Sequence, residues 1–142
     1  MTLERTRRAD YRRFEPIETR WSDNDVYGHV NNVVYYAWFD TAVNRMLIAE
    51  RLLDIHGGDS IGLVVETGCR YFASTAFPDS ITAGIRVAKL GTSSVRYEIG
   101  LFRGDEDEPA AVGFFVHVYV DRKTRRPKAL EEAMRGFLED LR

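Results

Sequence analysis

The chain has 142 residues, of which 44% are hydrophobic and 30% are charged, a composition typical of a globular protein with one apolar core. Twenty Lys and Arg residues against 22 Asp and Glu residues give a net charge of −2. This balance argues against nucleic acid or an anionic membrane as the principal partner, because both favour a basic protein surface. The single cysteine excludes an internal disulfide and a thiolate zinc cage. We expect one domain over residues 1–142.

Neither the start of the chain nor its apolar runs indicate secretion or a membrane span. Residues 1–8 lack the apolar segment of a secretory signal. Elsewhere, no apolar run reaches the roughly 18 residues that suggest a membrane span. We therefore expect a cytoplasmic protein that does not bind membranes.

The predicted elements begin with a short strand and a long helix. Uncharged and charged residues alternate over 17–21, which predicts a strand whose entry is limited by Pro16. Residues 32–50 are too many for one strand, and apolar side chains surround the first turns, as in a buried helix. Asn32 is a candidate N-cap, because its side-chain oxygen can accept hydrogen bonds from first-turn amides.

Four segments of alternating apolar residues follow and are separated by short turns. Their apolar positions are the odd residues of 61–71, 81–87 and 95–101 and the even residues of 112–120. This pattern predicts an antiparallel meander. A final helix is predicted with Pro127 as its first residue. Its apolar stripe consists of Leu130, Met134, Leu138 and Leu141.

Together these elements predict an α+β fold. A sheet with one apolar face must cover that face, and the long apolar helix is the available filling. We expect a curved antiparallel sheet wrapped around one long helix, with a second helix at the C-terminus.

The chemically densest stretch covers residues 20–32 and reads Arg-Trp-Ser-Asp-Asn-Asp-Val-Tyr-Gly-His-Val-Asn-Asn. It places carboxylates, a histidine and carboxamides just before the long helix, where amide donors and the positive end of the helix dipole would face a ligand. A purely structural interpretation is that Asp23, Asn24 and Asp25 form turns. Asn31 and Asn32 would then cap the helix.

Metal binding by this stretch is not supported. An EF-hand would need an oxygen ligand where the chain has Tyr27 and a bidentate glutamate where it has Val34. A zinc site would need a second histidine or cysteine nearby. We therefore expect no metal ion and no resident cofactor.

The same stretch resembles a motif of the hotdog-fold acyl thioesterases, in particular the hydroxybenzoyl-coenzyme A thioesterase branch and its acyl-CoA thioesterase relatives. The residues that carry the resemblance are Asp23, Asp25, Gly28, His29, Val30, Asn31, Asn32 and Tyr35. An aromatic helix follows them, and the order of strand, helix and antiparallel meander is also similar. The resemblance thus covers nearly the whole chain.

The resemblance implies hydrolysis of an acyl-CoA or acyl-carrier-protein thioester, in which coenzyme A is part of the substrate. In that branch the aspartate matching Asp25 attacks the thioester or activates water, and the backbone amide matching Asn32 polarises the thioester carbonyl. Plant acyl-carrier-protein thioesterases have a histidine that matches His29. They have an asparagine where this chain has Tyr27, so the residue that partners Asp25 stays open.

Elementary chemistry agrees with this assignment. Thioester hydrolysis needs a base or nucleophile and a donor for the developing oxyanion. A carboxylate just before a helix N-terminus supplies both. His29 either orients Asp25 or the attacking water, or bonds the loop backbone as a structural histidine. Substrate contacts are expected from Tyr27, Gly28 and Tyr35.

Two further segments are candidates for substrate binding. The turn residues Thr92, Ser93 and Ser94 are candidate contacts for pantetheine or phosphate, although turn formation alone also explains them. A basic run follows the last strand and either anchors the phosphates of coenzyme A or forms a solvated face. It consists of Arg122, Lys123, Arg125, Arg126 and Lys128.

Three remaining residues are given structural roles. Glu66 and Arg70 lie on one face of a predicted strand and are expected to form a solvated pair. Cys69 lies on the apolar face and is expected to be a small core residue, because no adjacent base would activate its thiol.

Two other functions stay open. A hotdog hydratase or dehydratase would keep the fold, but it would carry an Asp-x-x-Pro-x-His pattern, and Asp25 and His29 are spaced differently. A non-catalytic acyl-CoA-binding module is the second alternative. We also expect a homo-oligomer, either a dimer or a dimer of dimers, with the site at the subunit boundary. Joining two sheets removes one hydrogen-bonding edge from each.

Overall fold

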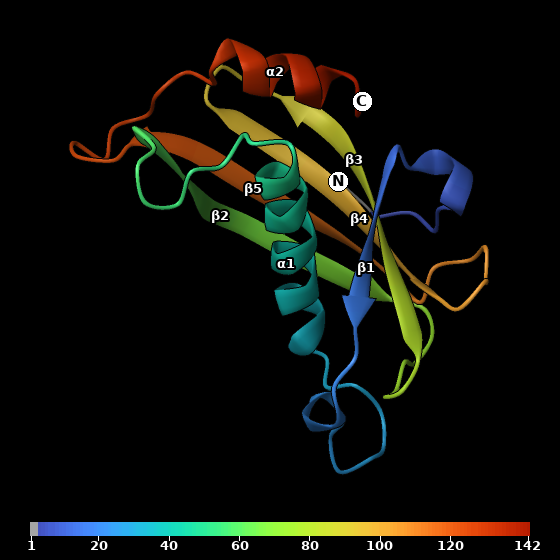
Figure 1. The fold of residues 1–142 in the computed structure, drawn as a ribbon. Coiled ribbons are helices and arrows are strands. Elements are labelled where there is room, and N and C mark those ends of the chain that lie inside the picture. Colours follow the sequence, from blue (N-terminus) through green and yellow to red (C-terminus); the bar gives the residue numbers. More distant parts are fainter. Residues whose placement is uncertain (1–2) are drawn as a thin grey trace.

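The computed structural model describes residues 3–142 (Figure 1). Five strands form one antiparallel sheet in the order β1-β3-β4-β5-β2. The strands are β1 (Arg13–Glu18), β2 (Ser60–Tyr71), β3 (Ser80–Leu90), β4 (Ser94–Arg103) and β5 (Ala111–Asp121). The helices are α1 (Val34–Ala49) and α2 (Glu132–Glu139), with short 3-10 helices η1 (Arg8–Asp10) and η2 (Trp21–Asp23). The predicted α+β fold is confirmed, but the predicted meander of four successive strands holds only for β3, β4 and β5, because β2 pairs with β5 and not with β3.

Helix α1 packs against one face of the curved sheet and supplies much of the core (Figure 1). Phe39, Val43 and Met46 are fully buried and recur with the spacing of one helix face. The helix is not buried all round, however, because the apolar residues Val33 and Ile48 at its two ends are 63% and 47% exposed. No helix within residues 3–142 is long and apolar enough to span a membrane.

Strand β1 is one edge of the sheet and differs from its prediction. It begins at Arg13 and ends at Glu18, whereas the alternation predicted residues 17–21. Pro16 lies inside the strand, which an edge position tolerates because one side of the strand has no neighbour to bond. Trp21 belongs to η2 and is 77% exposed.

Strand β2 is the other edge, and a bulge divides it. The register with β5 shifts between Val64 and Glu66. The extra residue places the odd positions before the bulge (61–63) and after it (67–71) on opposite faces. The prediction of one continuous odd-numbered face over this strand is therefore wrong.

Strand β5 presents the odd positions to the core, opposite to the prediction. Phe115, His117 and Tyr119 are buried, whereas the even positions of 114–118 are half-buried. Both rows of the strand are largely apolar, so hydrophobic alternation alone does not distinguish them.

Helix α2 begins at Glu132, later than the predicted start at Pro127. Pro127 instead pairs with Val120 in an isolated bridge. The predicted apolar stripe is confirmed, since its four residues are all buried: Leu130, Met134, Leu138 and Leu141.

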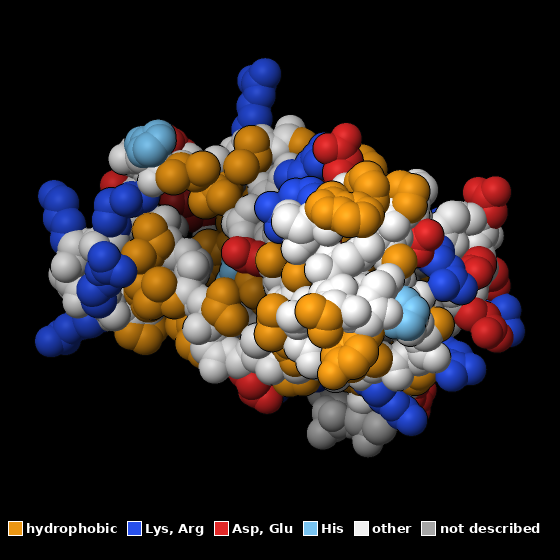
Figure 2. Space-filling view, turned by 90° about the horizontal axis from the view of Figure 1, so that it is seen from below, with side chains coloured by type: hydrophobic (Ala, Val, Ile, Leu, Met, Phe, Trp, Pro, Cys, Tyr) orange, Lys and Arg blue, Asp and Glu red, His pale blue; other side chains and the backbone are white. Residues whose placement is uncertain are grey.

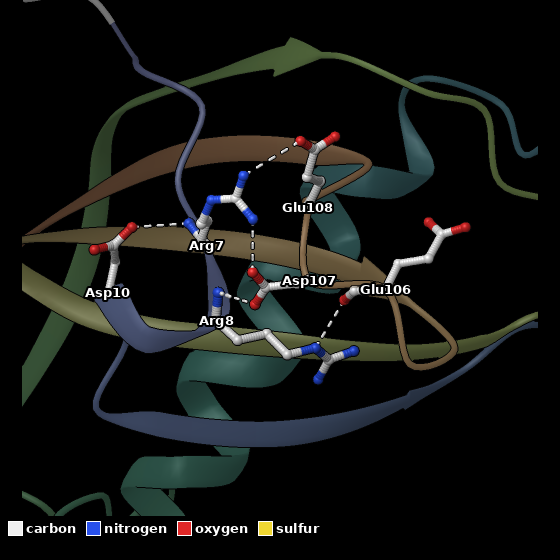
Figure 3. A network of polar contacts seen from close by, with 6 residues as sticks. All are labelled: Arg7, Arg8, Asp10, Glu106, Asp107 and Glu108. Atoms are coloured by element: carbon white, nitrogen blue, oxygen red, sulfur yellow. Dashed lines mark hydrogen bonds and ion pairs between the residues drawn. The ribbon is translucent and has the colours of Figure 1, made fainter.

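Polar contacts tie the N-terminal segment to the loop between β4 and β5 (Figure 3). Arg7 donates to the carboxylate of Asp107 at 2.8 Å and lies 3.6 Å from that of Glu108. The guanidinium of Arg8 donates to the carbonyl of Glu106 at 2.8 Å. These ion pairs are solvent-exposed, so each contributes little to stability. Together they position the N-terminal segment against this loop.

Candidate active site

Residues 20–33, here called the motif loop, connect β1 to α1 at the lower end of the molecule in Figure 1. The segment after β2 holds this loop in place. The Val30 N–H donates to the Thr75 carbonyl at 2.8 Å, and the Asn24 side chain accepts from the Phe77 N–H at 2.9 Å. A bridge between Asn24 and Val30 closes the loop on itself. These contacts present its tip at a defined position.

Asp23 is the structural carboxylate of the loop. It is 1% exposed, and its Oδ1 accepts from the Arg20 guanidinium at 3.0 and 2.8 Å. Its Oδ2 accepts from the Arg20 N–H at 2.8 Å, and its carbonyl accepts from the Asn31 N–H at 2.9 Å. Asp23 is thus fully committed to holding the loop together.

Asp25 is half-buried, and its carboxylate accepts fewer hydrogen bonds than that of Asp23. Its Oδ1 accepts from the Tyr27 N–H at 2.9 Å, and Oδ2 has no hydrogen-bond donor within residues 3–142. A tight turn surrounds it, because its N–H donates to the His29 carbonyl at 2.8 Å and its carbonyl accepts from Gly28 at 3.1 Å. Gly28 has φ +83°, a conformation that favours glycine. The turn therefore leaves one carboxylate oxygen available.

Helix α1 starts one residue later than predicted, and Asn32 is not its N-cap. The cap position is Val33. Asn31 accepts from the Val33 N–H through its side chain at 3.2 Å and from the Val34 N–H through its carbonyl at 3.0 Å. Within the part of the chain that the structure describes, the Asn32 N–H donates to no protein acceptor. This amide is available at the helix start.

The motif loop borders two hollows. The His29 hollow, of about 320 Å³, is lined by His29, Val30, Asn32, Tyr35, Tyr71, Phe72, Ala73 and Ser74. The Asp25 hollow, of about 680 Å³, is lined by Trp21, Asn24, Asp25, Val26, Tyr27, Gly28 and Asn31. The structure thus groups His29 with Asn32 and Tyr35, and it groups Asp25 with Tyr27 and Gly28. The two predicted groups are contributed by one loop but do not line one hollow.

Two tyrosines form a wall of the His29 hollow. The Tyr35 hydroxyl lies 2.7 Å from the Thr75 hydroxyl, and its ring meets that of Tyr71 edge to face at 5.0 Å. The Tyr71 hydroxyl donates to the Asn32 carbonyl at 2.8 Å. Burial raises the pKa of both phenols, so both stay protonated at neutral pH. Tyr71 was missed as a site residue, and its aromatic position at the end of a predicted strand was the available signal.

The Asp25 hollow has an exposed apolar rim. Trp21, Val26 and Tyr27 are 77%, 93% and 84% exposed. The Trp21 ring meets that of Phe77 edge to face at 6.1 Å. Figure 2 views the molecule from below and shows apolar side chains exposed among charged ones. Clustered exposed apolar side chains are typical of a surface that meets a ligand or a partner.

The turn of Thr92, Ser93 and Ser94 lies at the opposite end of the sheet. The motif loop adjoins the start of β3, whereas this turn follows the end of β3 (Figure 1). The Thr92 carbonyl accepts from the Leu130 N–H at 3.0 Å, and the Ser93 carbonyl accepts from the Tyr119 N–H at 2.7 Å. Within one chain, this turn is separated from the motif loop.

The basic run lies at the same upper end, and its residues differ in whether they bond to the protein or are exposed to solvent. The Arg122 guanidinium donates to the Ile55 carbonyl at 2.9 Å and to the Gly58 carbonyl, so it holds the loop before β2. The side chains of Lys123, Arg125 and Arg126 are exposed. Only part of the run is therefore free to meet an anion.

The remaining candidates have structural surroundings. Cys69 is half-buried, and burial raises the pKa of its thiol to about 11, which disfavours the nucleophilic thiolate. Glu66 and Arg70 are exposed, but within residues 3–142 they do not form the expected pair. Arg70 donates instead to the Leu3 carbonyl at 3.1 Å. Among the same residues, no group of His, Cys, Asp and Glu could hold a metal ion.

Comparison with known proteins adds a family to this geometry. Residues 19–138 match the model of the thioesterase-like superfamily. The crystal structure of the PA5185 protein from Pseudomonas aeruginosa strain PAO1 is 55% identical, with 98% of this chain and 97% of that chain covered and a TM-score of 0.95. No curated protein matches this chain.

Two more distant structures share the fold. Slr0204, a 1,4-dihydroxy-2-naphthoyl-CoA thioesterase from Synechocystis, is 17% identical, with 90% and 96% of the two chains covered and a TM-score of 0.81. A DHNA-CoA thioesterase from Staphylococcus aureus is 21% identical, with 89% and 86% covered and a TM-score of 0.76.

The antiparallel sheet around α1 is therefore the hotdog fold, and the chain belongs to the thioesterase-like superfamily. The resemblance carried by the motif loop is confirmed at this level. By class the protein is a thioester hydrolase.

Proposed function

We propose that this chain is an acyl-CoA thioesterase in which Asp25 is the base or nucleophile and the Asn32 N–H polarises the thioester carbonyl. The observation that carries the proposal is that a carboxylate oxygen and a backbone amide on the same loop each lack a hydrogen-bond partner within residues 3–142. Asp25 keeps one carboxylate oxygen without a protein donor, and Asn32 keeps its amide without a protein acceptor, within residues 3–142. A carboxylate and an oxyanion donor are the minimum that thioester hydrolysis requires.

The two hollows suggest how a thioester would lie. The thioester carbonyl would lie at the loop between the two hollows, with its oxygen toward the Asn32 N–H and its carbon within reach of the Asp25 carboxylate. Gly28 places no side chain in the way, and no other group lies within 4 Å of its missing Cβ. His29 lines the Asn32 side, which supports a role near the carbonyl or the attacking water.

Two routes fit this arrangement. In one, Asp25 attacks the carbonyl carbon, the thiolate of coenzyme A leaves and is protonated, and water then hydrolyses the mixed anhydride. In the other, Asp25 takes a proton from water, which attacks the carbonyl carbon directly. Both give a free acid and a free thiol, and both need the oxyanion donor at the helix start.

The proposal includes a homo-oligomer joined along β2. This edge strand has 12 residues, and Leu63, Val64 and Val65 are 39%, 48% and 60% exposed. An exposed apolar edge is a template for pairing with another chain. Antiparallel pairing with a second copy would bring the basic run and the Thr92–Ser94 turn of one chain toward the partner's motif loop. Either a dimer or a dimer of dimers satisfies this requirement.

A charge on the edge tests the assembly. In a Val64→Lys variant, light scattering should show a monomer and thiol release should fall, because pairing would bury an unpaired ammonium. Ala88→Lys is a matched exposed strand position away from this edge. A wild-type monomer with full activity would contradict the shared site.

The reaction is tested with a panel of aliphatic and aromatic acyl-CoAs, in which a thiol reagent follows the release of free coenzyme A. A thioesterase releases thiol from at least one member. A hydratase would change an enoyl group without releasing thiol, and a binding module would retain the intact thioester. Either outcome would overturn the proposal. The same acyl groups carried on acyl carrier protein distinguish the two carriers.

A further inference from the structure

The free edge of β2 carries two opposite charges, Glu66 and Arg70. Both are exposed, and neither forms an ion pair with another residue in the part of the chain that the structure describes. Both lie opposite even-numbered residues of β5, on the sheet face that points away from α1. Four residues along a strand span about 13 Å, so the two side chains do not reach each other. Arg70 donates to the Leu3 carbonyl at 3.1 Å and keeps further N–H donors.

The backbone of this edge is also free to bond another strand. The Phe72 N–H donates to the Ala110 carbonyl at 2.8 Å, which continues the ladder between β2 and β5. Hydrogen-bonded and non-hydrogen-bonded residues alternate in an antiparallel ladder. The backbone groups of Thr67, Cys69 and Tyr71 therefore point to the free edge, where a further strand can pair with them.

The two charges select one register for a symmetric pair of β2 edges. In a two-fold contact, residue i of one copy meets residue j of the other, and j meets i. A register centred on Gly68 places Glu66 against Arg70 of the second copy, and this pair occurs twice. A register centred on Glu66 or on Arg70 instead places like charges directly opposite each other, which is destabilising. Registers centred on other residues leave both charges unpaired.

We propose that the β2 edges of two copies pair around Gly68, with each Glu66 bonded to Arg70 of the other copy. This assignment rests on the edge pairing proposed above and adds its register. The even residues of β2 then form the non-hydrogen-bonded pairs, in which side chains are closest. The same register brings Val65 of the second copy next to Tyr71, which lines the His29 hollow. The second copy thus contributes to the wall of that hollow.

Disulfide trapping reads the register directly. With Gly68 at the centre, Thr67 faces Cys69 of the second copy in a hydrogen-bonded pair, whose Cα atoms lie about 5.5 Å apart, a separation that a disulfide spans. A Thr67→Cys variant should therefore form a covalent dimer under mild oxidation, seen on a non-reducing gel. Leu63→Cys is the control, because residue 63 faces Cys69 only in a register centred on Glu66. This control should form no covalent dimer.

The outcomes distinguish this register from the edge pairing itself. A wild-type monomer in light scattering would overturn both. A dimer that Val64→Lys dissociates, but that is crosslinked through Leu63→Cys or through neither cysteine variant, would overturn the register alone. Thiol release from acyl-CoA is measured separately, so a failure of the proposed reaction is visible independently of either result.

Charge reversal tests the ion pairs. Glu66→Arg alone or Arg70→Glu alone places like charges opposite each other, so the dissociation constant of the dimer in sedimentation should rise roughly tenfold. In an equimolar mixture of the two variants every pair again joins opposite charges, so association should return to near the wild-type value. Glu18→Arg, at an exposed position on the other edge strand, is the matched control and should change nothing. A mixture that associates no more tightly than either variant alone would overturn the assignment.

Discussion

The two ends of the sheet treat their polar groups in opposite ways. At the lower end, within residues 3–142, the Asn32 N–H and one carboxylate oxygen of Asp25 have no protein partner, and Trp21, Val26 and Tyr27 are exposed. At the upper end the turn carbonyls and the Arg122 guanidinium hold loops together, and the polar side chains of His117 and Tyr119 are buried. The lower end therefore leaves polar and apolar groups accessible, whereas the upper end buries its polar side chains.

The largest effect is expected at the lower end, from Asp25→Asn. Asparagine keeps the size of the side chain and an acceptor for the Tyr27 N–H, but it removes the negative charge. We expect kcat to fall about a hundredfold or more, as loss of a positioned base does, with little change in melting temperature. Unchanged turnover on the best acyl-CoA would remove Asp25 from the mechanism. A loss explained by unfolding would make it a turn residue.

At the upper end, the burial of His117 should make the free energy of unfolding depend on pH. Burial lowers the pKa of His117 to about 4, below its value of about 6.5 in the unfolded chain, so the unfolded state binds more protons between these values. Stability is therefore lost as pH falls through this window. Between about pH 7 and pH 5 we expect a loss of about 2 kcal/mol in urea unfolding. His117→Phe should remove that loss, whereas exposed His56→Gln should not.

Asp23→Asn sharpens the contrast with its neighbour two positions along the loop. Asp23 is buried, and its carboxylate takes three hydrogen bonds from Arg20. Weakening these charge-assisted bonds should lower the free energy of unfolding by roughly 1–2 kcal/mol. Most of the activity should remain in conditions where the variant is folded. A large loss of kcat without loss of stability would place Asp23 in the chemistry.

The smallest effect is expected from the free part of the basic run and the neighbouring turn. Replacing Lys123, Arg125 and Arg126 by glutamine and Thr92 and Ser94 by alanine should raise KM by roughly threefold to tenfold and spare kcat. Phosphate contacts act alike on ground and transition states. An acyl-N-acetylcysteamine substrate, which lacks the nucleotide phosphates, serves as the control and should show no change. Equal KM values for acyl-CoA would refute the assignment.

The sequence predicted the parts of the molecule that depend on local pattern. Helix α1, the meander of β3, β4 and β5, and the stripe from Leu130 to Leu141 all follow from hydrophobic period, whereas the place of β2 beside β5 does not. The motif loop is recognisable from its residues, because few positions before a buried helix combine acidic, glycine and histidine residues in this order. The placement of His29 and Asn32 in the same hollow depends on the path of the loop in space, and the spacing of these residues in the sequence does not reveal that path.

The parts that failed depend on pairing between distant segments. The bulge after Val64 is a property of the register between β2 and β5, so alternation within β2 alone could not reveal it. The inward row of β5 was misassigned because both rows are apolar. Residues Phe115 to Tyr119 contain a histidine and a tyrosine on the buried side, where a sequence pattern favours valine. The N-cap moved from Asn32 to Val33 because Asn31 already supplies the capping acceptors.

The hydrogen bond from Tyr71 to the Asn32 carbonyl joins the last residue of the β2 edge to the start of α1. If that edge is the interface between two copies, this bond links the interface to the backbone of Asn32, whose amide we propose polarises the thioester carbonyl. Association and substrate binding then share a coupling free energy, and this coupling is reciprocal: whatever factor dimerisation contributes to substrate affinity, substrate returns to dimerisation. Specific activity would consequently rise with protein concentration, and saturating substrate would move that rise to lower concentration.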